Sequence, residues 1–251
     1  MRKRIVAGNW KMNKGYREGA ALAREIVEGI AERGDPGCDV VLMPPFVSLP
    51  AVMEAIEGSS IESGAQDIFY EESGAFTGEI SGGMLVELGV RYVLTGHSER
   101  RHVIGESNDI VARKLRAALD SGLTPVLCVG ELLEEREADR AEEVVLGQLR
   151  TALEGLTADQ CAKVVVAYEP VWAIGTGKTA TPEDASHMHG VIRKALGDLH
   201  GTDISESTAI LYGGSVKPQN AAQLFGSPDI DGVLVGGASL ASDSFLGIIY
   251  P

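Results

Sequence analysis

The sequence predicts an α/β protein, a single-domain (β/α)8 barrel of eight parallel strands over residues 1–251. Eight short apolar runs bounded by turn residues recur along the chain, and segments with helical periodicity separate most of them. Most positions of the runs are apolar without strict alternation, which is typical of strands buried on both faces, and strands that alternate with helices pair in parallel. Eight such units in 251 residues match the count and length of this barrel.

The predicted strands begin and end at turn residues. They are Ile5–Ala7, Val40–Met43, Ile61–Ala65, Tyr92–Thr95, Thr124–Val129, Val164–Tyr168, Thr208–Tyr212 and Val233–Val235. In the first gap Leu22, Ile26 and Ile30 recur at helical spacing, and similar triplets occur in later gaps. The acidic segment Glu131–Glu143 is interpreted as the solvated face of a helix and its approach. No linker or low-complexity tract divides the chain, so we expect one domain.

Composition excludes several classes of function. The formal net charge of −14 argues against nucleic-acid binding, although an anionic substrate is compatible with it if positive groups are concentrated locally. The three cysteines, Cys38, Cys128 and Cys161, are expected to be free thiols in a reducing compartment. The sequence shows no signal-peptide core and no membrane span, and its histidines lack metal-ligand spacing. We therefore expect a cytoplasmic protein without a metal or a membrane partner.

One stretch organises the functional prediction. Glu169 follows the sixth apolar run directly, at the strand end where an α/β barrel places its chemistry. Pro170 takes the chain out of the sheet, and a glycine-rich loop follows. The loop ends at Thr181-Pro182-Glu183-Asp184, a strong helix-start signal. A carboxylate at a strand end beneath a loop with stiff ends is typical of a general base under a closing lid.

Three other interpretations of this stretch were weighed. Gly177-Lys178-Thr179 resembles the end of a P-loop, but that motif needs glycine at position 172, which is Trp172. Residues 175–180 match a dinucleotide-binding fingerprint, but residues 170–174 separate them from the strand that the first glycine should close. An ordinary surface loop beside a solvated glutamate would be the default if no other residues converged here.

Polar residues and glycines follow the other strands, where the carboxyl ends of a barrel meet. They are Asn9 and Lys11 after the first run, His97 and Glu99 after the fourth, Ser215 after the seventh, and Gly236 and Gly237 after the eighth. Glycines at these ends let amide hydrogens approach a phosphate, and a lysine supplies a fixed cation. A histidine can polarise a carbonyl or shuttle a proton. Together they predict a site for a small phosphorylated substrate.

Five motifs resemble those of the triosephosphate isomerase family, and the resemblance covers the whole chain. They are Ala-Gly-Asn-Trp-Lys-Met-Asn at 7–13, Gly-His-Ser-Glu-Arg-Arg at 96–101, Ala-Tyr-Glu-Pro-Val-Trp-Ala-Ile-Gly-Thr-Gly-Lys at 167–178, Tyr-Gly-Gly-Ser-Val at 212–216 and Val-Gly-Gly-Ala-Ser-Leu at 235–240. The resemblance implies interconversion of dihydroxyacetone phosphate and D-glyceraldehyde 3-phosphate through an enediolate, in glycolysis and gluconeogenesis, with no cofactor.

The resemblance also implies a role for each site residue. Glu169 resembles the base that moves a proton between two carbons, and His97 the electrophile that moves protons between two oxygens. Lys11 and Asn9 match residues at the substrate oxygens, and Glu99 matches a neighbour of the lysine. The implied phosphate clamp consists of the backbone amides of Gly175, Ser215, Gly236 and Gly237.

Members of this family are usually dimers. Ser73–Glu79 resembles the loop that enters the partner subunit, with Thr77 near the partner's Asn9 and the partner's Lys11. Phe76 stands where many relatives carry tyrosine. The rival hypothesis is a non-catalytic scaffold with the same fold, which the complete set of polar residues argues against.

Overall fold

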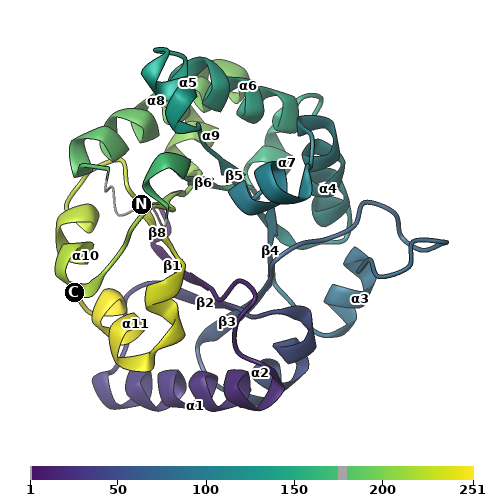
Figure 1. The fold of residues 1–251 in the computed structure, drawn as a ribbon, viewed down its shortest axis with the longest axis vertical. Coiled ribbons are helices and arrows are strands. Elements are labelled where there is room, and N and C mark those ends of the chain that lie inside the picture. Colours follow the sequence, from purple (N-terminus) through teal and green to yellow (C-terminus); the bar gives the residue numbers. More distant parts are fainter. Residues whose placement is uncertain (1, 175–179) are drawn as a thin grey trace.

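Eight strands form a closed parallel barrel in the computed structural model, which describes residues 2–174 and 180–251. Each strand pairs with the next in sequence order, and β8 closes the barrel against β1 (Figure 1). The strands are β1 Ile5–Asn9, β2 Asp39–Met43, β3 Ile61–Ala65, β4 Tyr92–Thr95, β5 Thr124–Val129, β6 Val165–Tyr168, β7 Ile210–Tyr212 and β8 Gly232–Val235. The predicted (β/α)8 barrel is confirmed.

Strand boundaries differ from the predicted ones by at most two residues. β7 begins at Ile210 rather than Thr208, because Thr208 is still bonded to the preceding helix: both its N–H and its hydroxyl donate to the carbonyl of Ile204, at 2.9 and 2.8 Å. β1 continues to Asn9, since Asn9 pairs with Met43 of β2. The strand register thus carries Asn9 into the barrel mouth.

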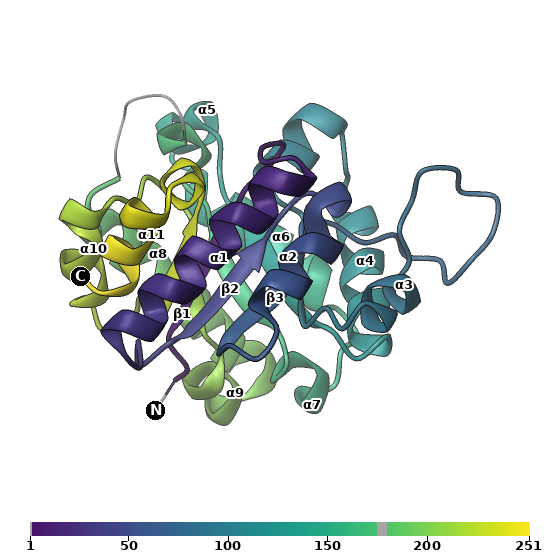
Figure 2. The ribbon, with the colours of Figure 1, turned by 90° about the horizontal axis from the view of Figure 1, so that it is seen from below.

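Helices surround the barrel (Figures 1 and 2). They are α1 Tyr16–Arg33, α2 Leu49–Ile56, α3 Gly82–Glu87, α4 Asn108–Asp120, α5 Leu133–Glu137, α6 Ala141–Leu153, α7 Ala158–Cys161, α8 Pro182–His200, α9 Thr202–Ser207, α10 Pro218–Phe225 and α11 Ser242–Ile249. A π-helical turn spans Arg100–Ile104, and short 3₁₀ turns span Phe46–Ser48, Val171–Ala173 and Gly237–Leu240. None of the described helices has the length and apolar composition of a membrane span.

The predicted helix start after the glycine-rich loop is confirmed. The hydroxyl of Thr181 accepts the N–H of Asp184 at 3.1 Å, and the Asp184 carboxylate accepts the N–H of Thr181 at 3.2 Å. Pro182 occupies the first turn, where a missing N–H costs no helical hydrogen bond. The reciprocal cap fixes where α8 begins and therefore where the loop after β6 must end.

The core has two layers because successive residues of a strand face opposite sides of the sheet. Thirteen buried residues, among them Val41, Leu94 and Leu211, fill the inside of the barrel. Alternate positions such as Leu42 and Val166 pack outward into the helices. This arrangement explains why most strand positions are apolar on both faces of the sheet. On the helix side, Leu22, Ile26 and Ile30 of α1 are buried as their spacing predicts.

The interpretation of Glu131–Glu143 as a solvated face is wrong for Glu131. Its side chain is fully buried and accepts hydrogen bonds from the hydroxyl of Tyr168 at 3.1 Å and from Nε1 of Trp172 at 2.8 Å. The rest of the segment lies outside the barrel mouth, and most of its acidic side chains are exposed. Glu131 differs because it comes two residues after the end of β5, close enough for its carboxylate to reach Tyr168 at the end of β6 and Trp172 just beyond it.

A buried ionic cluster joins the loops after β3 and β4. Nζ of Lys114, on α4, contacts both carboxylate oxygens of Asp67 at 2.7 Å and Oε1 of Glu106 at 2.6 Å. Arg100 contacts the same two carboxylates at 2.9 and 2.6 Å. Burial raises the pKa of Asp67 in spite of these cations. The cluster holds the segment that carries the turn after His97.

We expect Lys114→Met to lower the free energy of unfolding by about 3 kcal/mol, because it leaves two buried carboxylates with one cation between them. Urea denaturation would measure this loss. Lys194→Met is the matched control: Lys194 is exposed and pairs with Asp198 on its own helix, so its loss should change stability by less than about 1 kcal/mol. Equal effects of the two substitutions would contradict a structural role for the cluster.

Candidate active site

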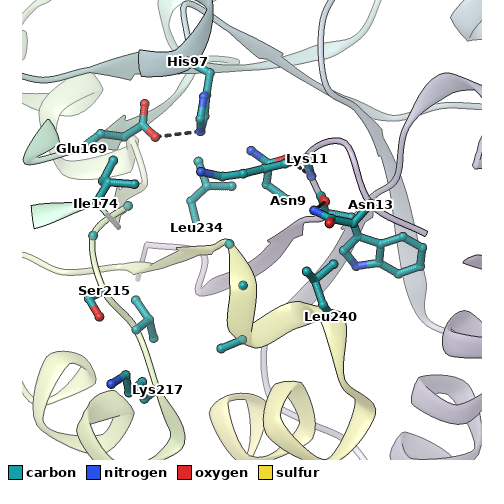
Figure 3. Close-up of a pocket in the computed structure, with 17 residues that line it drawn as sticks. Asn9, Lys11, Asn13, His97, Glu169, Ile174, Ser215, Lys217, Leu234 and Leu240 are labelled. Atoms are coloured by element: carbon teal, nitrogen blue, oxygen red, sulfur yellow. Dashed lines mark hydrogen bonds and ion pairs between the residues drawn. The ribbon is translucent and has the colours of Figure 1, made fainter. Parts of the chain in front are cut away.

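A cavity of about 340 Å³ opens at the carboxyl ends of the strands (Figure 3). Its lining comes from the segments after β1, β4, β6, β7 and β8. The lining residues are Asn9, Trp10, Lys11, Asn13, His97, Glu169, Ile174, Gly213, Gly214, Ser215, Val216, Lys217, Leu234, Gly236, Gly237, Ala238 and Leu240. These segments lie far apart in the sequence. They converge here because parallel strands all end at the same rim of the barrel.

Glu169 and His97 form a buried pair on one side of the cavity. Oε1 of Glu169 lies 3.0 Å from Nε2 of His97, and Oε2 of Glu169 accepts the backbone N–H of Ser98 at 3.0 Å. Both side chains are almost completely shielded from solvent, at 2% and 5% exposure. Gly213 makes room for this arrangement, since a Cβ there would lie 2.8 Å from Cγ of Glu169.

The surroundings of Glu169 favour its charged form. Burial by itself raises the pKa of a carboxyl, but the hydrogen bonds from Nε2 of His97 and from the N–H of Ser98, with the nearby charge of Lys11, outweigh it. The net pKa of Glu169 is below the ordinary value. The carboxylate that lies in the cavity is therefore ionised at neutral pH, as a general base must be.

His97 faces opposing influences. Burial lowers its pKa, while the carboxylate of Glu169 raises it, and the balance lies above the ordinary value. The hydrogen-bond geometry assigns the proton: the backbone N–H of Glu99 donates to Nδ1 at 3.2 Å, so Nδ1 must be an unprotonated acceptor. We therefore assign the neutral ring with its proton on Nε2, which donates to Glu169 while that carboxylate stays beside it. Without the carboxylate, burial and Lys11 would favour the neutral ring further.

Lys11 follows β1 and brings a cation into the cavity, where its side chain extends toward His97 and Glu169 (Figure 3). Its Nζ lies 2.6 Å from Oε1 of Glu99, and its backbone N–H donates to Oδ1 of Asn9 at 3.0 Å. Its φ of 51° lies in the left-handed region, which costs a residue other than glycine on the order of 1 to 3 kcal/mol. Such strain at a charged residue of a cavity is typical of a functional position.

Ser215, Gly236 and Gly237 also line the cavity, and Ser215 lies apart from Glu169 in Figure 3. Lys11 passes alongside Gly236: a Cβ at this position would lie 3.5 Å from Cε of Lys11, an ordinary van der Waals separation. The fourth residue of the predicted clamp, Gly175, lies outside the described residues, as do the following residues of the loop through Thr179. Within the described residues, no cluster of three or more potential metal ligands occurs.

A family model described as triosephosphate isomerase matches residues 4–251. The chain belongs to the triosephosphate isomerase family. Proteins named triosephosphate isomerase from Roseiflexus sp. strain RS-1 and Chloroflexus aurantiacus are each 52% identical over 250 residues, which is 100% of this chain and 98% and 99% of theirs. One from Rhodopirellula baltica is 51% identical over 248 residues, 99% of this chain and 97% of its own.

The structure brings together nearly all the residues that the resemblance to the triosephosphate isomerase family assigned. Asn9, Lys11, His97 and Glu169 line the cavity directly. Glu99 does not line the cavity. It contacts Nζ of Lys11 from outside it. Glu99 is thus placed to hold the cation rather than to touch a bound molecule.

The sequence patterns did not predict several residues that line the cavity of this triosephosphate isomerase family member. Leu234 and Leu240 are ordinary apolar residues, and the sequence does not reveal which way their side chains face. Asn13 is the last residue of the motif at 7–13 and carries no separate signal. Lys217 lies beyond Ser215 at the outer end of the cavity (Figure 3). Its proximity to Ser215 in the sequence was the one available signal, because a cation near a phosphate site is expected to help capture an anion.

We expect the pKa of Glu169 in the ligand-free protein to lie below the ordinary value of about 4.3. His97→Leu should raise it, because burial then acts without the imidazole that opposes it. Carbon-13 NMR of labelled glutamate carboxyl groups would follow both titrations, with the Glu169 signal assigned by its loss in Glu169→Gln. An unchanged pKa in His97→Leu would show that the Ser98 amide or Lys11 holds the carboxylate charged instead.

Proposed function

We propose that Glu169, His97 and Lys11 perform the reaction of this enzyme. As a member of its family the chain is a triosephosphate isomerase, an enzyme of glycolysis that interconverts dihydroxyacetone phosphate and D-glyceraldehyde 3-phosphate. The reaction moves a proton from one carbon to its neighbour and from one oxygen to the other. The proposal rests on one observation: the buried carboxyl group of Glu169, the imidazole of His97 and the ammonium group of Lys11 face a single cavity.

The Glu169 carboxylate would remove a proton from C1 of dihydroxyacetone phosphate. Both of its oxygens are engaged by His97 and Ser98 in the ligand-free protein, so the side chain must first turn away from them toward the substrate. Leaving these donors removes the interactions that lower the pKa of Glu169, while burial, which raises it, persists. The carboxylate would thus become a stronger base where it meets the C–H bond.

The same movement would free Nε2 of His97. Its N–H could then donate to the substrate carbonyl at C2, where negative charge develops as the C1 proton leaves. The proton on the Glu169 carboxyl returns to C2, and His97 exchanges protons with the two oxygens, so the aldose forms without net gain or loss of protons. Lys11 would stabilise the enediolate electrostatically, in a cavity where water screens its charge poorly.

The phosphate group would lie at the end bordered by Ser215, Gly236 and Gly237. Amide hydrogens near glycines suit an anion, because no Cβ prevents close approach. We include Gly175 in this clamp on the family resemblance alone, as we include Asn9 at the substrate oxygens. These contacts would fix the substrate so that C1 faces Glu169.

A non-catalytic scaffold with the same fold is the alternative. The complete set of Asn9, Lys11, His97 and Glu169 in one cavity favours catalysis. A coupled assay that consumes D-glyceraldehyde 3-phosphate formed from dihydroxyacetone phosphate would decide, with Glu169→Gln protein as the control for contaminating activity. Equal rates in the two preparations would support the scaffold.

Glu169→Asp should lower kcat by on the order of 100-fold, because the shorter side chain withdraws the carboxylate by about 1 Å from the C–H bond. KM should change much less, since the phosphate contacts remain. Steady-state kinetics in both reaction directions would test this. A wild-type kcat in the variant would remove Glu169 from the role of base.

We propose further that two copies of the chain associate through the Ser73–Glu79 segment. The segment between β3 and α3 projects away from the barrel in both views (Figures 1 and 2). All of its residues from 73 to 79 are exposed, including Phe76, which contacts Phe69 at a ring distance of 4.7 Å. An exposed loop of this length supports a partner of the same kind, which would cover it.

Sedimentation at micromolar concentration should give about twice the chain mass of 26.5 kDa. Phe76→Asp should shift the population toward the monomer, because a buried charge without a partner opposes association. Glu72→Gln, also exposed but outside the segment, is the control and should leave the mass unchanged. A fully active monomer of the unmodified protein would refute the proposed assembly.

We also propose a cytoplasmic location. Cys38, Cys128 and Cys161 are all free thiols. Burial raises the pKa of Cys38 and Cys161 to about 11, so neither has the low pKa of a reactive redox thiol. Three unpaired thiols suit a reducing compartment.

A further inference from the structure

We propose that Gln66 is a positioning residue for the reaction: it holds the backbone of Lys11 so that the ammonium group stays in the cavity. The inference rests on the proposed role of Lys11 as the cation of the site. Gln66 is not among the residues that line the cavity, so it would act on the reaction through Lys11 alone.

The starting point is the strained backbone of Lys11. Its φ of 51° is one that lysine rarely adopts, so neighbouring groups must hold it there. Both polar groups of its backbone are bound by side chains: Oδ1 of Asn9 accepts its N–H at 3.0 Å, and Nε2 of Gln66 donates to its carbonyl at 2.9 Å. Asn9 precedes Lys11 by two residues, whereas Gln66 reaches it from another strand.

Gln66 connects the ends of three neighbouring strands. It directly follows β3, and its second amide hydrogen donates to the carbonyl of Met43, the last residue of β2, at 2.9 Å. The Met43 carbonyl also accepts the N–H of Trp10, just beyond β1, at 3.1 Å. The Gln66 amide therefore fixes the Lys11 carbonyl relative to the rigid strand ends rather than to another part of the same loop.

The direction of the Lys11 side chain depends on this backbone. Its Cε passes close to Gly236, and its Nζ reaches Glu99 at 2.6 Å from the far side of the barrel mouth. If Lys11 relaxed to a common φ, its Cα–Cβ bond would turn and the ammonium group would leave this position. Gln66 thus opposes the relaxation that the strain favours.

Glutamine suits this position for a specific reason. Two carbonyl oxygens face its side chain, and the terminal amide supplies two hydrogens from one nitrogen. Glutamate would present carboxylate oxygens to these carbonyls, and asparagine is one methylene shorter and would not span them both. Leucine has similar volume but donates no hydrogen bond.

Gln66→Leu tests the inference in a double-mutant cycle with Lys11→Met. We expect kcat/KM to fall by about 10- to 100-fold in the wild-type background, consistent with displacement of a reacting group by roughly 1 Å. In the Lys11→Met background the same change should cost less than about threefold, because no ammonium group is left to misplace. If Gln66→Leu does not fold, Gln66→Asn takes its place in the cycle.

Gln148→Leu is the matched control. Gln148 is a buried glutamine whose amide, like that of Gln66, bonds to backbone: it donates to the carbonyl of Gly130 at 3.0 Å and accepts the N–H of the same residue at 2.8 Å. Its loss should lower thermal stability, and any effect on kcat/KM should be equal with and without Lys11. Sedimentation of each variant would establish that the assembly is unchanged.

A spectroscopic measurement separates positioning from general destabilisation. The carbon-13 resonance of Lys11 Cε, assigned by its loss in Lys11→Met, should shift in Gln66→Leu and stay in place in Gln148→Leu. An unshifted resonance, or equal losses of kcat/KM in both backgrounds, would overturn the inference. If Lys11→Met itself retains full activity, the proposed role of Lys11 fails first, and that result is distinct from a failure of Gln66 alone.

Discussion

The 3.0 Å contact between Oε1 of Glu169 and Nε2 of His97 is the interaction on which the rest of the site depends. Each group stabilises the other in a buried environment. A carboxylate removed from water needs donors to remain charged, and a buried imidazole needs an acceptor for its N–H. The contact also prepares the reaction, since the substrate would replace one partner of each group. In the proposed reaction the two groups would thus be protected until the substrate separates them.

The pair needs a rigid frame, which the closed barrel supplies. β4 and β6 are not neighbours, because β5 lies between them. The N–H of Glu169 donates to the carbonyl of Val129 on β5, and the Tyr168 carbonyl accepts the N–H of Gly213 after β7. Glu169 is therefore fixed from both sides by the sheet that continues into the site. Buried Glu131 extends this support by bonding Tyr168 and Trp172 on either side of it.

The acidic composition of the chain makes the placement of cations important. A net charge of −14 repels a phosphorylated substrate at long range, so local positive charge must act close to the cavity. Lys11 lies at its wall and Lys217 at its outer end. The strained backbone of Lys11 contributes to this placement. Its unfavourable φ directs the charged side chain to a position that a relaxed backbone would not give it.

The sequence by itself determined the barrel and most of the site. Apolar runs such as Tyr92–Thr95 mark strands because both faces of such a strand are buried, and residues after each run must meet at one rim. The motifs then located Glu169, His97 and Lys11. Tertiary structure alone decided which partners those residues have: that Ser98 bonds Glu169, that Gln66 bonds Lys11, and that Glu131 is buried. These contacts join residues distant in sequence, or depend on the direction of one side chain, and local patterns carry no record of either.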